Sequence, residues 1–184
     1  GILYCQYKKF NEGLKYFNKA IKINGKHAGL YCNKGNAHLE LNEFEEAIKN
    51  YDTAISLHPK LVDAYYNKAN ALQKLQNFEE SINYYNKALE LNSNLFDAYV
   101  NKGNSLKNLK KLDEAIINYN KAIEIKSNEA EPNWNKAITL LLKGDLEEGW
   151  KYYEWRWRKN NFSSEKRNFS QPLWLGNFSI NKKI

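Results

Sequence analysis

The sequence predicts an all-α fold built of stacked helix–turn–helix units. It matches itself without gaps when shifted by 34 residues, from residue 1 to about residue 153, and each period holds two stretches of apolar residues at helical spacing. Three of the matching columns hold small residues and one holds aromatic residues: Gly35, Ala69, Gly103 and Ala137; Gly13, Ala47, Ser81, Ala115 and Gly149; Ala20, Ala54, Ala88 and Ala122; and Phe17, Tyr51, Tyr85, Tyr119 and Tyr153.

Residues 62–95 illustrate the two helices of one period. One apolar stripe comes before the polar pair Gln76–Asn77, and a second comes after it. Asn77 with Glu80 resembles a capping box at the start of the second helix. Gly, Ala or Ser lets two helix backbones approach closely, and the aromatic column then fills the space beside that crossing.

The period divides the chain into units. We expect the second half of a truncated repeat at residues 1–27 and whole repeats at 28–61, 62–95 and 96–129. A divergent terminal repeat with a long second helix follows at 130–163, and a linker or cap segment at 164–184 leads toward a further domain. Gly1 falls at the eighth position of a repeat and the chain contains no Met, so we expect the natural protein to continue before it.

These units resemble the tetratricopeptide repeat in their length, their helix–turn–helix form and their small and aromatic positions. Pro59 lies where that family often ends its second helix, whereas Ser93 and Ser127 replace proline in the next two repeats. The resemblance implies a right-handed superhelix in which the first helices line the concave side. It also implies a protein- or peptide-binding module.

Each first helix carries two asparagines three residues apart, which places both on one helical face. Asn is a mediocre helix former, so its recurrence calls for a role. Stacking would align the asparagines in two rows, of which the second stops at Ile138. The two rows and the aromatic residues beside them form the predicted peptide-binding face: Asn33, Asn67, Asn101 and Asn135; Asn36, Asn70 and Asn104; and Tyr66 and Trp134.

Two roles stay open for these rows. Side-chain amides both donate and accept, so they can pair with the backbone of an extended peptide whatever its sequence, as in the asparagine ladder of the O-GlcNAc transferases, which this region resembles. Alternatively, each amide bonds to a neighbouring helix and holds the stacking angle. The abundance of Asn, 27 of 184 residues, also contributes to the recurrence. The adjacent side chains are apolar or acidic, which argues against a carboxylate clamp for peptide C-termini.

A row of lysines accompanies the first asparagine row. We predict that their aliphatic stems lie along the protein while their ammonium groups stay in solvent. The row consists of Lys34, Lys68, Lys102 and Lys136.

The end of the array departs from the pattern. Trp150 and Trp157 fall in core columns, Arg156 replaces a small Ala, and Trp155 falls in an outward column. An outward Trp needs a cover. We expect the segment SQPLWLGNF, which contains Trp174, or a further domain to provide it.

Two phrases near the C-terminus, GDLEEGWKYYEWRWR and SQPLWLGNFSINKKI, carry a second resemblance. They look like the junction in bacterial proteins where tetratricopeptide repeats run into an O-GlcNAc transferase-like glycosyltransferase domain. This implies that the chain is the substrate- or partner-recognition region and that the catalytic residues lie beyond Ile184. A stand-alone repeat scaffold for protein assembly or self-association is the alternative.

No catalytic residue, metal site or cofactor is predicted, so we expect the chain itself not to be an enzyme. Cys5 and Cys32 lack metal-ligand spacing, and the three His are scattered. No Gly-rich phosphate loop or catalytic-triad spacing is present. Acidic pairs such as Glu79–Glu80 open second helices, where they complement the helix dipole.

The distribution of charge and hydropathy argues against some classes of binding partner. The net charge is +5 over residues 1–27, −4 over 28–150 and +6 over 151–184, which argues against a continuous nucleic-acid stripe. The basic, aromatic tail keeps nucleic acid as a lesser alternative. No apolar run is long enough to span a membrane, and reduced thiols without a signal peptide predict a cytoplasmic protein. The helix face left unpaired at the N-terminal half repeat admits a homo-oligomer.

Overall fold

The computed structural model describes residues 1–158, which form helices joined by short turns, without a strand. Contacts divide these residues into two compact units, of which the first is residues 1–98 and the second begins at residue 99. The first unit contains α1 (Ile2–Gln6), α2 (Phe10–Ile23), α3 (Ala28–Glu40), α4 (Phe44–Leu57), α5 (Val62–Lys74), α6 (Phe78–Leu91) and the start of α7 (Phe96–Asn108). The second contains the rest of α7, α8 (Leu112–Ile125), α9 (Ala130–Lys143), α10 (Leu146–Tyr153) and the 3₁₀ helix η1 (Glu154–Arg158).

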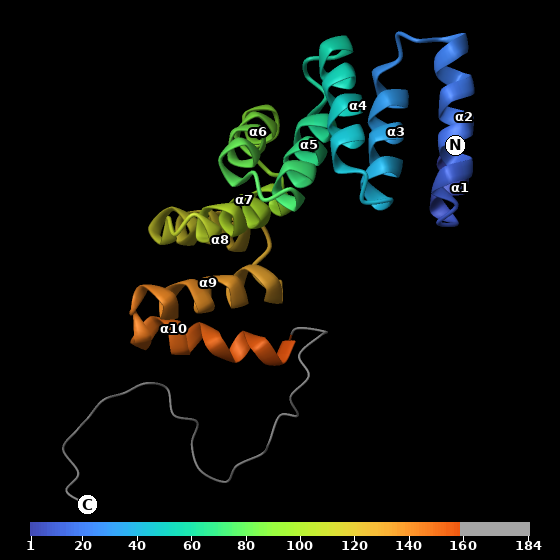
Figure 1. Ribbon diagram of the computed structural model, residues 1–184. Coiled ribbons are helices and arrows are strands. Elements are labelled where there is room, and N and C mark those ends of the chain that lie inside the picture. Colours follow the sequence, from blue (N-terminus) through green and yellow to red (C-terminus); the bar gives the residue numbers. More distant parts are fainter. Residues whose placement is uncertain (159–184) are drawn as a thin grey trace, which may run out of the picture. The chain divides into compact units, whose positions relative to one another are not determined.

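Helix positions repeat along the chain with a constant interval. The first helices α3, α5, α7 and α9 begin at residues 28, 62, 96 and 130, and the second helices α4, α6, α8 and α10 begin at 44, 78, 112 and 146. Within each unit, helices that follow one another in the chain pack side by side, as α3 does with α4 in the first unit and α9 with α10 in the second (Figure 1). The predicted all-α repeat fold is therefore confirmed.

The turn between the two helices of a repeat always uses a left-handed residue. In the whole repeats at 28–61, 62–95 and 96–129 this residue is Asn42 (φ 60°), Gln76 (φ 59°) and Lys110 (φ 61°), and in the last repeat it is Gly144 (φ 93°). The next amide bonds back to the carbonyl five residues earlier, as from Asn77 N to Leu72 O at 2.9 Å, which is the Schellman pattern that ends many helices. Asn and Gly adopt left-handed backbone readily, whereas most other residues do so only at a cost. At Gln76 and Lys110 the turn is therefore held by its hydrogen bonds rather than by side-chain preference.

The predicted small and aromatic columns meet where the two helices of a repeat cross. Tyr51, Tyr85 and Tyr119 are completely buried. A Cβ added to Gly35 would lie 2.6 Å from the ring of Tyr51, and one added to Gly103 would lie 2.5 Å from the ring of Tyr119. The interpretation of these columns as close helix crossings is confirmed.

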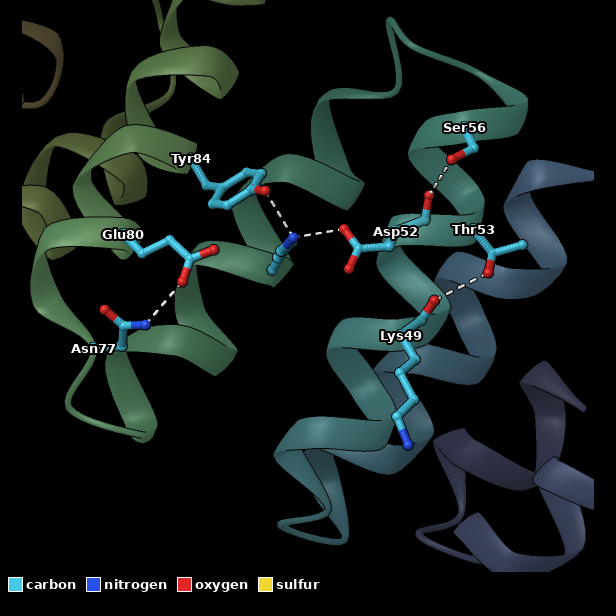
Figure 2. Close-up of polar contacts among 8 residues, drawn as sticks. Lys49, Asp52, Thr53, Ser56, Asn77, Glu80 and Tyr84 are labelled. Carbon is cyan, nitrogen blue, oxygen red and sulfur yellow. Dashed lines mark hydrogen bonds and ion pairs between the residues drawn. The ribbon is translucent and has the colours of Figure 1, made fainter.

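The helix caps differ between repeats. The Asp145 carboxylate accepts from the backbone N–H of Glu148 at 3.4 Å, as a capping residue does. Asn77 stands at the N-cap position of α6, but its side chain accepts no hydrogen bond from the helix backbone, so the predicted capping box is wrong there. Its Nδ2 donates instead to the Glu80 carboxylate at 2.8 Å, because a carboxamide can donate as well as accept (Figure 2).

The last repeat differs from the expectation of a long second α-helix. Helix α10 ends at Tyr153, and the chain continues as η1. Arg156, which replaces a small residue, stacks its guanidinium 4.4 Å from the rings of both Tyr153 and Trp157 and donates to Glu154 at 2.8 Å. These contacts within five residues accompany the tighter winding of a 3₁₀ turn, which is common at helix C-termini.

The predicted tryptophan environments at this end are also corrected. Trp150 and Trp157 are only half-buried rather than in a closed core. Trp155 is half-buried rather than exposed, and the Arg158 guanidinium lies 4.5 Å from its ring centre. Trp174 and the segment expected to cover Trp155 lie outside the described residues, as does everything after residue 158.

Candidate functional site

The second-row asparagines bond to the buried tyrosines. Tyr51 Oη donates to Asn36 Oδ1 at 2.8 Å, and Tyr85 Oη donates to Asn70 Oδ1 at 2.7 Å. In the second unit the Tyr119 hydroxyl donates to Asn104 Oδ1 at 2.8 Å. A buried hydroxyl needs a partner, and burial raises the pKa of Tyr51 and Tyr119, which keeps both as neutral donors.

The first-row asparagines bond to the second row of the preceding repeat. Asn67 Nδ2 donates to Asn36 Oδ1 at 2.9 Å in the first unit. Asn135 Nδ2 donates to Asn104 Oδ1 at 3.0 Å in the second. The asparagines therefore do connect neighbouring helices, as the structural alternative predicts. Peptide binding by the same residues stays a prediction.

The last repeat lacks this arrangement. Ile138 stands in the second-row column, so the aligned Tyr153 has no such amide acceptor there. Tyr153 instead packs against aromatic rings, with its ring centre 5.0 Å from that of Trp134 and 4.8 Å from that of Trp150. The buried tyrosine and the second-row asparagine that accepts from its hydroxyl thus occur together in the middle repeats.

An asparagine whose side-chain oxygen accepts two hydrogen bonds still has an NH₂ group available. The Oδ1 atoms of Asn36 and Asn104 each accept two hydrogen bonds, which uses both lone pairs. Their Nδ2 groups donate to nothing within residues 1–158, and no buried side-chain N or O atom there lacks a partner. Both NH₂ groups therefore contact solvent. Asn33 makes no side-chain hydrogen bond within the same residues, so its amide is open as well.

The other predicted site residues are partly covered by packing. Asn70 and Asn101 are half-buried, and Asn135 is 9% exposed. Tyr66 packs against the cluster of Ala69, Tyr85 and Ala98, with its ring centre 6.1 Å from that of Tyr85. Only part of each of these side chains is therefore accessible to a ligand.

A cavity of about 420 Å³ opens beside Asn33 and Asn36 in the first unit. Apolar side chains from α1, α2 and α3 form much of its wall, and two charged side chains, Lys8 and Glu40, lie on its lining. The apolar lining residues are Ile2, Cys5, Phe10, Phe17 and Ala37. Sequence reasoning did not find this cavity, because it depends on how three helices meet.

The lysine row does not have solvated ammonium groups throughout, so that prediction is wrong for two members. Lys68 is 5% exposed, and its Nζ lies 2.5 Å from the Asp52 carboxylate and 2.8 Å from the Tyr84 hydroxyl (Figure 2). Burial lowers the pKa of Lys68, but the hydrogen bonds with Asp52 and Tyr84 outweigh this and hold the pKa above its ordinary value. Figure 2 shows Asp52 and Tyr84 directed toward the same ammonium from two second helices.

Lys136 repeats part of this cluster in the second unit. It is 6% exposed, lies 3.3 Å from the Glu148 carboxylate, and its Nζ sits 3.9 Å from the ring centre of Tyr152. Tyr152 occupies the column of Tyr84. The cause of both corrections is the same: a tyrosine and a carboxylate let the ammonium leave water.

Lys102 differs from Lys68 and Lys136 in its surroundings. It is half-buried and makes no ion pair within the described part of the chain. Burial lowers its pKa, and the more distant Glu114 only partly offsets this. The residue aligned with Tyr84 in its repeat is Asn118, whose amide donates to the Glu114 carbonyl at 2.8 Å and so leaves the lysine without a tyrosine.

The two thiols differ in access. Cys32 is buried, and burial raises its pKa to about 11. Cys5 is half-buried at the cavity, with its pKa also raised by burial. Within residues 1–158 no three metal-ligating side chains gather, and no helix there combines the length and apolarity that a membrane span requires.

Family models of the tetratricopeptide repeat match the chain. One matches residues 62–95 and 96–129, and a second matches 16–49. A further model, of the same repeat type, matches 35–76. The matched residues together run from 16 to 129. No curated protein matches the chain in sequence.

Solved structures share the fold. MamA from Desulfovibrio magneticus is 17% identical with a TM-score of 0.77, over 86% of this chain and 92% of that one. YrrB, a repeat protein with an unusual peptide-binding site, is 24% identical with a TM-score of 0.72, over 83% and 79%. A tetratricopeptide repeat protein from Parabacteroides merdae is 19% identical with a TM-score of 0.75, over 83% and 60%. At these identities the likeness shows the fold alone.

Proposed function

Because this chain is built of tetratricopeptide repeats, we propose that it binds an extended segment of another protein through the asparagine rows of its first helices. The open NH₂ groups of Asn36 and Asn104 are the observation that supports this. Their oxygens are occupied within the protein, so each offers a donor that is already oriented. Backbone carbonyl oxygens of an extended peptide are the matching acceptors.

This proposal differs from a pure backbone-pairing ladder in one respect. An amide with both hydrogen-bonding groups free would pair with peptide N–H and C=O alike, whereas Asn36 and Asn104 can only donate. Preorientation lowers the entropy lost on binding. A segment bound at either position therefore pairs through a backbone carbonyl, largely independently of its side chains.

Isosteric substitutions test the proposal. Asn36→Asp and Asn104→Asp keep an oxygen for the tyrosine hydroxyl and the neighbouring amide, but they replace the donor by an acceptor. Peptides are selected from a random displayed library on the 184-residue chain, and affinity is measured by fluorescence anisotropy. Each variant should weaken binding by about three- to tenfold, the effect of one lost hydrogen bond, with thermal unfolding little changed.

The control is Asn83→Asp, at an exposed asparagine on the second helix α6. It makes the same chemical change without altering the first helices, so affinity should stay at the wild-type value. Equal affinity for all three variants and wild type, or no selected peptide at all, would exclude the proposal.

We further propose that the chain recognises substrates or partners for a glycosyltransferase domain. The support is in the sequence phrases GDLEEGWKYYEWRWR and SQPLWLGNFSINKKI. A stand-alone scaffold for assembly or self-association agrees equally well with the fold. The full-length natural protein, assayed for transfer of sugar from nucleotide sugars to protein, separates the two: transfer supports the first, and none supports the scaffold.

A further inference from the structure

We propose that the cavity between α1, α2 and α3 receives a bulky apolar side chain of the bound segment. This inference rests on the proposed peptide binding and names what the first unit selects. A cavity of about 420 Å³ lies within the range of sites that hold small organic groups. It is large enough for an aromatic or large aliphatic side chain.

Two apolar residues of the cavity lining are almost completely buried. Phe17 is 3% exposed and Ala37 is 1% exposed, so these two side chains leave only a small surface facing the cavity. Ile2 lies on the same lining and is 57% exposed. Covering such surface with an apolar group is favourable because it removes that surface from water.

Polar groups of the lining identify the occupant as part of a peptide. Asn33 and Asn36 both line the cavity, and both have an NH₂ group without a partner within the described residues. A hydrocarbon alone would not satisfy those donors. An amino-acid residue carries an apolar side chain and a backbone carbonyl next to each other, so it supplies both contacts at once.

The charged groups on the lining favour a neutral ligand. Lys8 and Glu40 have opposite charges, and neither makes an ion pair with another side chain of residues 1–158. A cationic or anionic side chain in the cavity would be attracted by one and repelled by the other. An uncharged side chain meets no such penalty.

Cys5 provides a built-in reporter for occupancy. Its thiol lines the cavity, whereas Cys32 is buried with a pKa raised to about 11. Alkylation by iodoacetamide near pH 8 should therefore modify Cys5 first, and intact mass gives the rate. The probe is N-acetyl-L-tryptophanamide, which combines an apolar ring with two amide carbonyls, and N-acetylglycinamide is its control.

The tryptophan probe should slow alkylation about threefold at twice its dissociation constant, because only the unoccupied fraction reacts. The glycine probe should have no effect. Gln6→Trp, at an exposed position on the lining, should remove the protection by filling the space. Asn33→Ala should weaken it without loss of stability, since that amide bonds to no other described side chain, and Asn83→Ala should not change it.

Equal effects of the two probes would overturn the inference. So would wild-type protection of Cys5 in a Gln6→Trp variant that melts as wild type does, or no effect of the tryptophan probe on the alkylation rate of Cys5. The proposed function fails separately. If a selected peptide depends on Asn36 but tolerates Ala at every apolar position, the proposed function stands and the role of the cavity is refuted. If the tryptophan probe binds but no peptide ligand is found, the cavity role stands and the proposed function is refuted.

Discussion

The two units use the same amide–tyrosine arrangement, but the environment of the lysine column changes from one repeat to the next. Asn36 in the first unit and Asn104 in the second each accept from one tyrosine and one asparagine at nearly equal distances. Lys68 in the first unit is buried against a carboxylate and a hydroxyl, whereas Lys102 in the second bonds to neither kind of group among residues 1–158. Register determines where a side chain lies, and its neighbours determine whether its charge stabilises the fold.

The largest effect should come from removing the shared acceptor. Asn36→Ala removes the oxygen that accepts from both the Tyr51 hydroxyl and the Asn67 amide, and we expect a loss of about 2 kcal/mol in unfolding free energy. Asn104→Ala should cost a similar amount if the two arrangements are equivalent. Urea unfolding followed by circular dichroism measures both, and a difference above about 1 kcal/mol would show that the equivalence is wrong.

The next effect concerns the partner of the buried ammonium. Asp52→Asn removes the charge that accompanies Lys68 into the interior, and we expect a loss of about 1–2 kcal/mol. This is below the cost of breaking a fully buried pair because the Asp52 side chain is 52% exposed. Lys68→Met in the Asp52→Asn background should recover part of that loss. No recovery in the double variant would mean that the ion pair is unimportant.

Replacing Lys68 and Lys102 by Met should change the unfolding free energy in different directions. Lys68→Met should destabilise, whereas Lys102→Met should be neutral or stabilising, because burial opposes the charge of Lys102. The raised pKa of Lys68 means that its contribution is present below the unfolded pKa, near 10.4, and is lost as pH rises through the higher folded pKa.

The pH dependence of Lys102 runs the other way. Its lowered pKa makes its charged form destabilising at neutral pH, and this penalty disappears as pH rises through the folded pKa toward the unfolded one. The unfolding free energy of wild type minus that of each Met variant is measured from pH 8 to 11. This difference should fall with rising pH for Lys68→Met and rise for Lys102→Met. Parallel curves would contradict the contrast.

The smallest effect concerns the turns, where the two units agree. Gln76→Gly and Lys110→Gly relieve left-handed backbone at residues with a Cβ, and each should raise the unfolding free energy by about 0.5 kcal/mol after the entropy cost of glycine. Gly144→Ala should lower it by about 1 kcal/mol. Thermal midpoints would reveal an error if all three shifts had the same sign.

Much of the fold could be predicted from the sequence because close helix crossings tolerate only small residues at one column and require a large ring at another. The turn residues Gln76 and Lys110 carry no such signal, since their conformation comes from the hydrogen bonds around them. The shortened α10 was missed because Arg156 bonds and stacks within its own turn, which a repeat pattern does not contain.

The sequence predicted where the candidate asparagines lie but not which of their atoms form hydrogen bonds. The sequence places the asparagines on one face, yet only the structure shows that the oxygen of Asn36 is used and its nitrogen is open. Lys68 was misjudged because Asp52 and Tyr84 each lie sixteen residues away, on different second helices. One signal was present: Tyr84 and Tyr152 alternate with Asn50 and Asn118 in the same column.

The bond from Asn67 back to Asn36 and that from Asn135 back to Asn104 give the array a direction. Each couples the unfolding of one repeat to that of the repeat before it, in addition to the nearest-neighbour packing that makes such arrays cooperative. Ile138 offers no oxygen to a successor. Lengthening this protein by duplicating a middle repeat after the last one would therefore create a weakly coupled junction, and Ile138→Asn is the substitution that would restore its cooperativity.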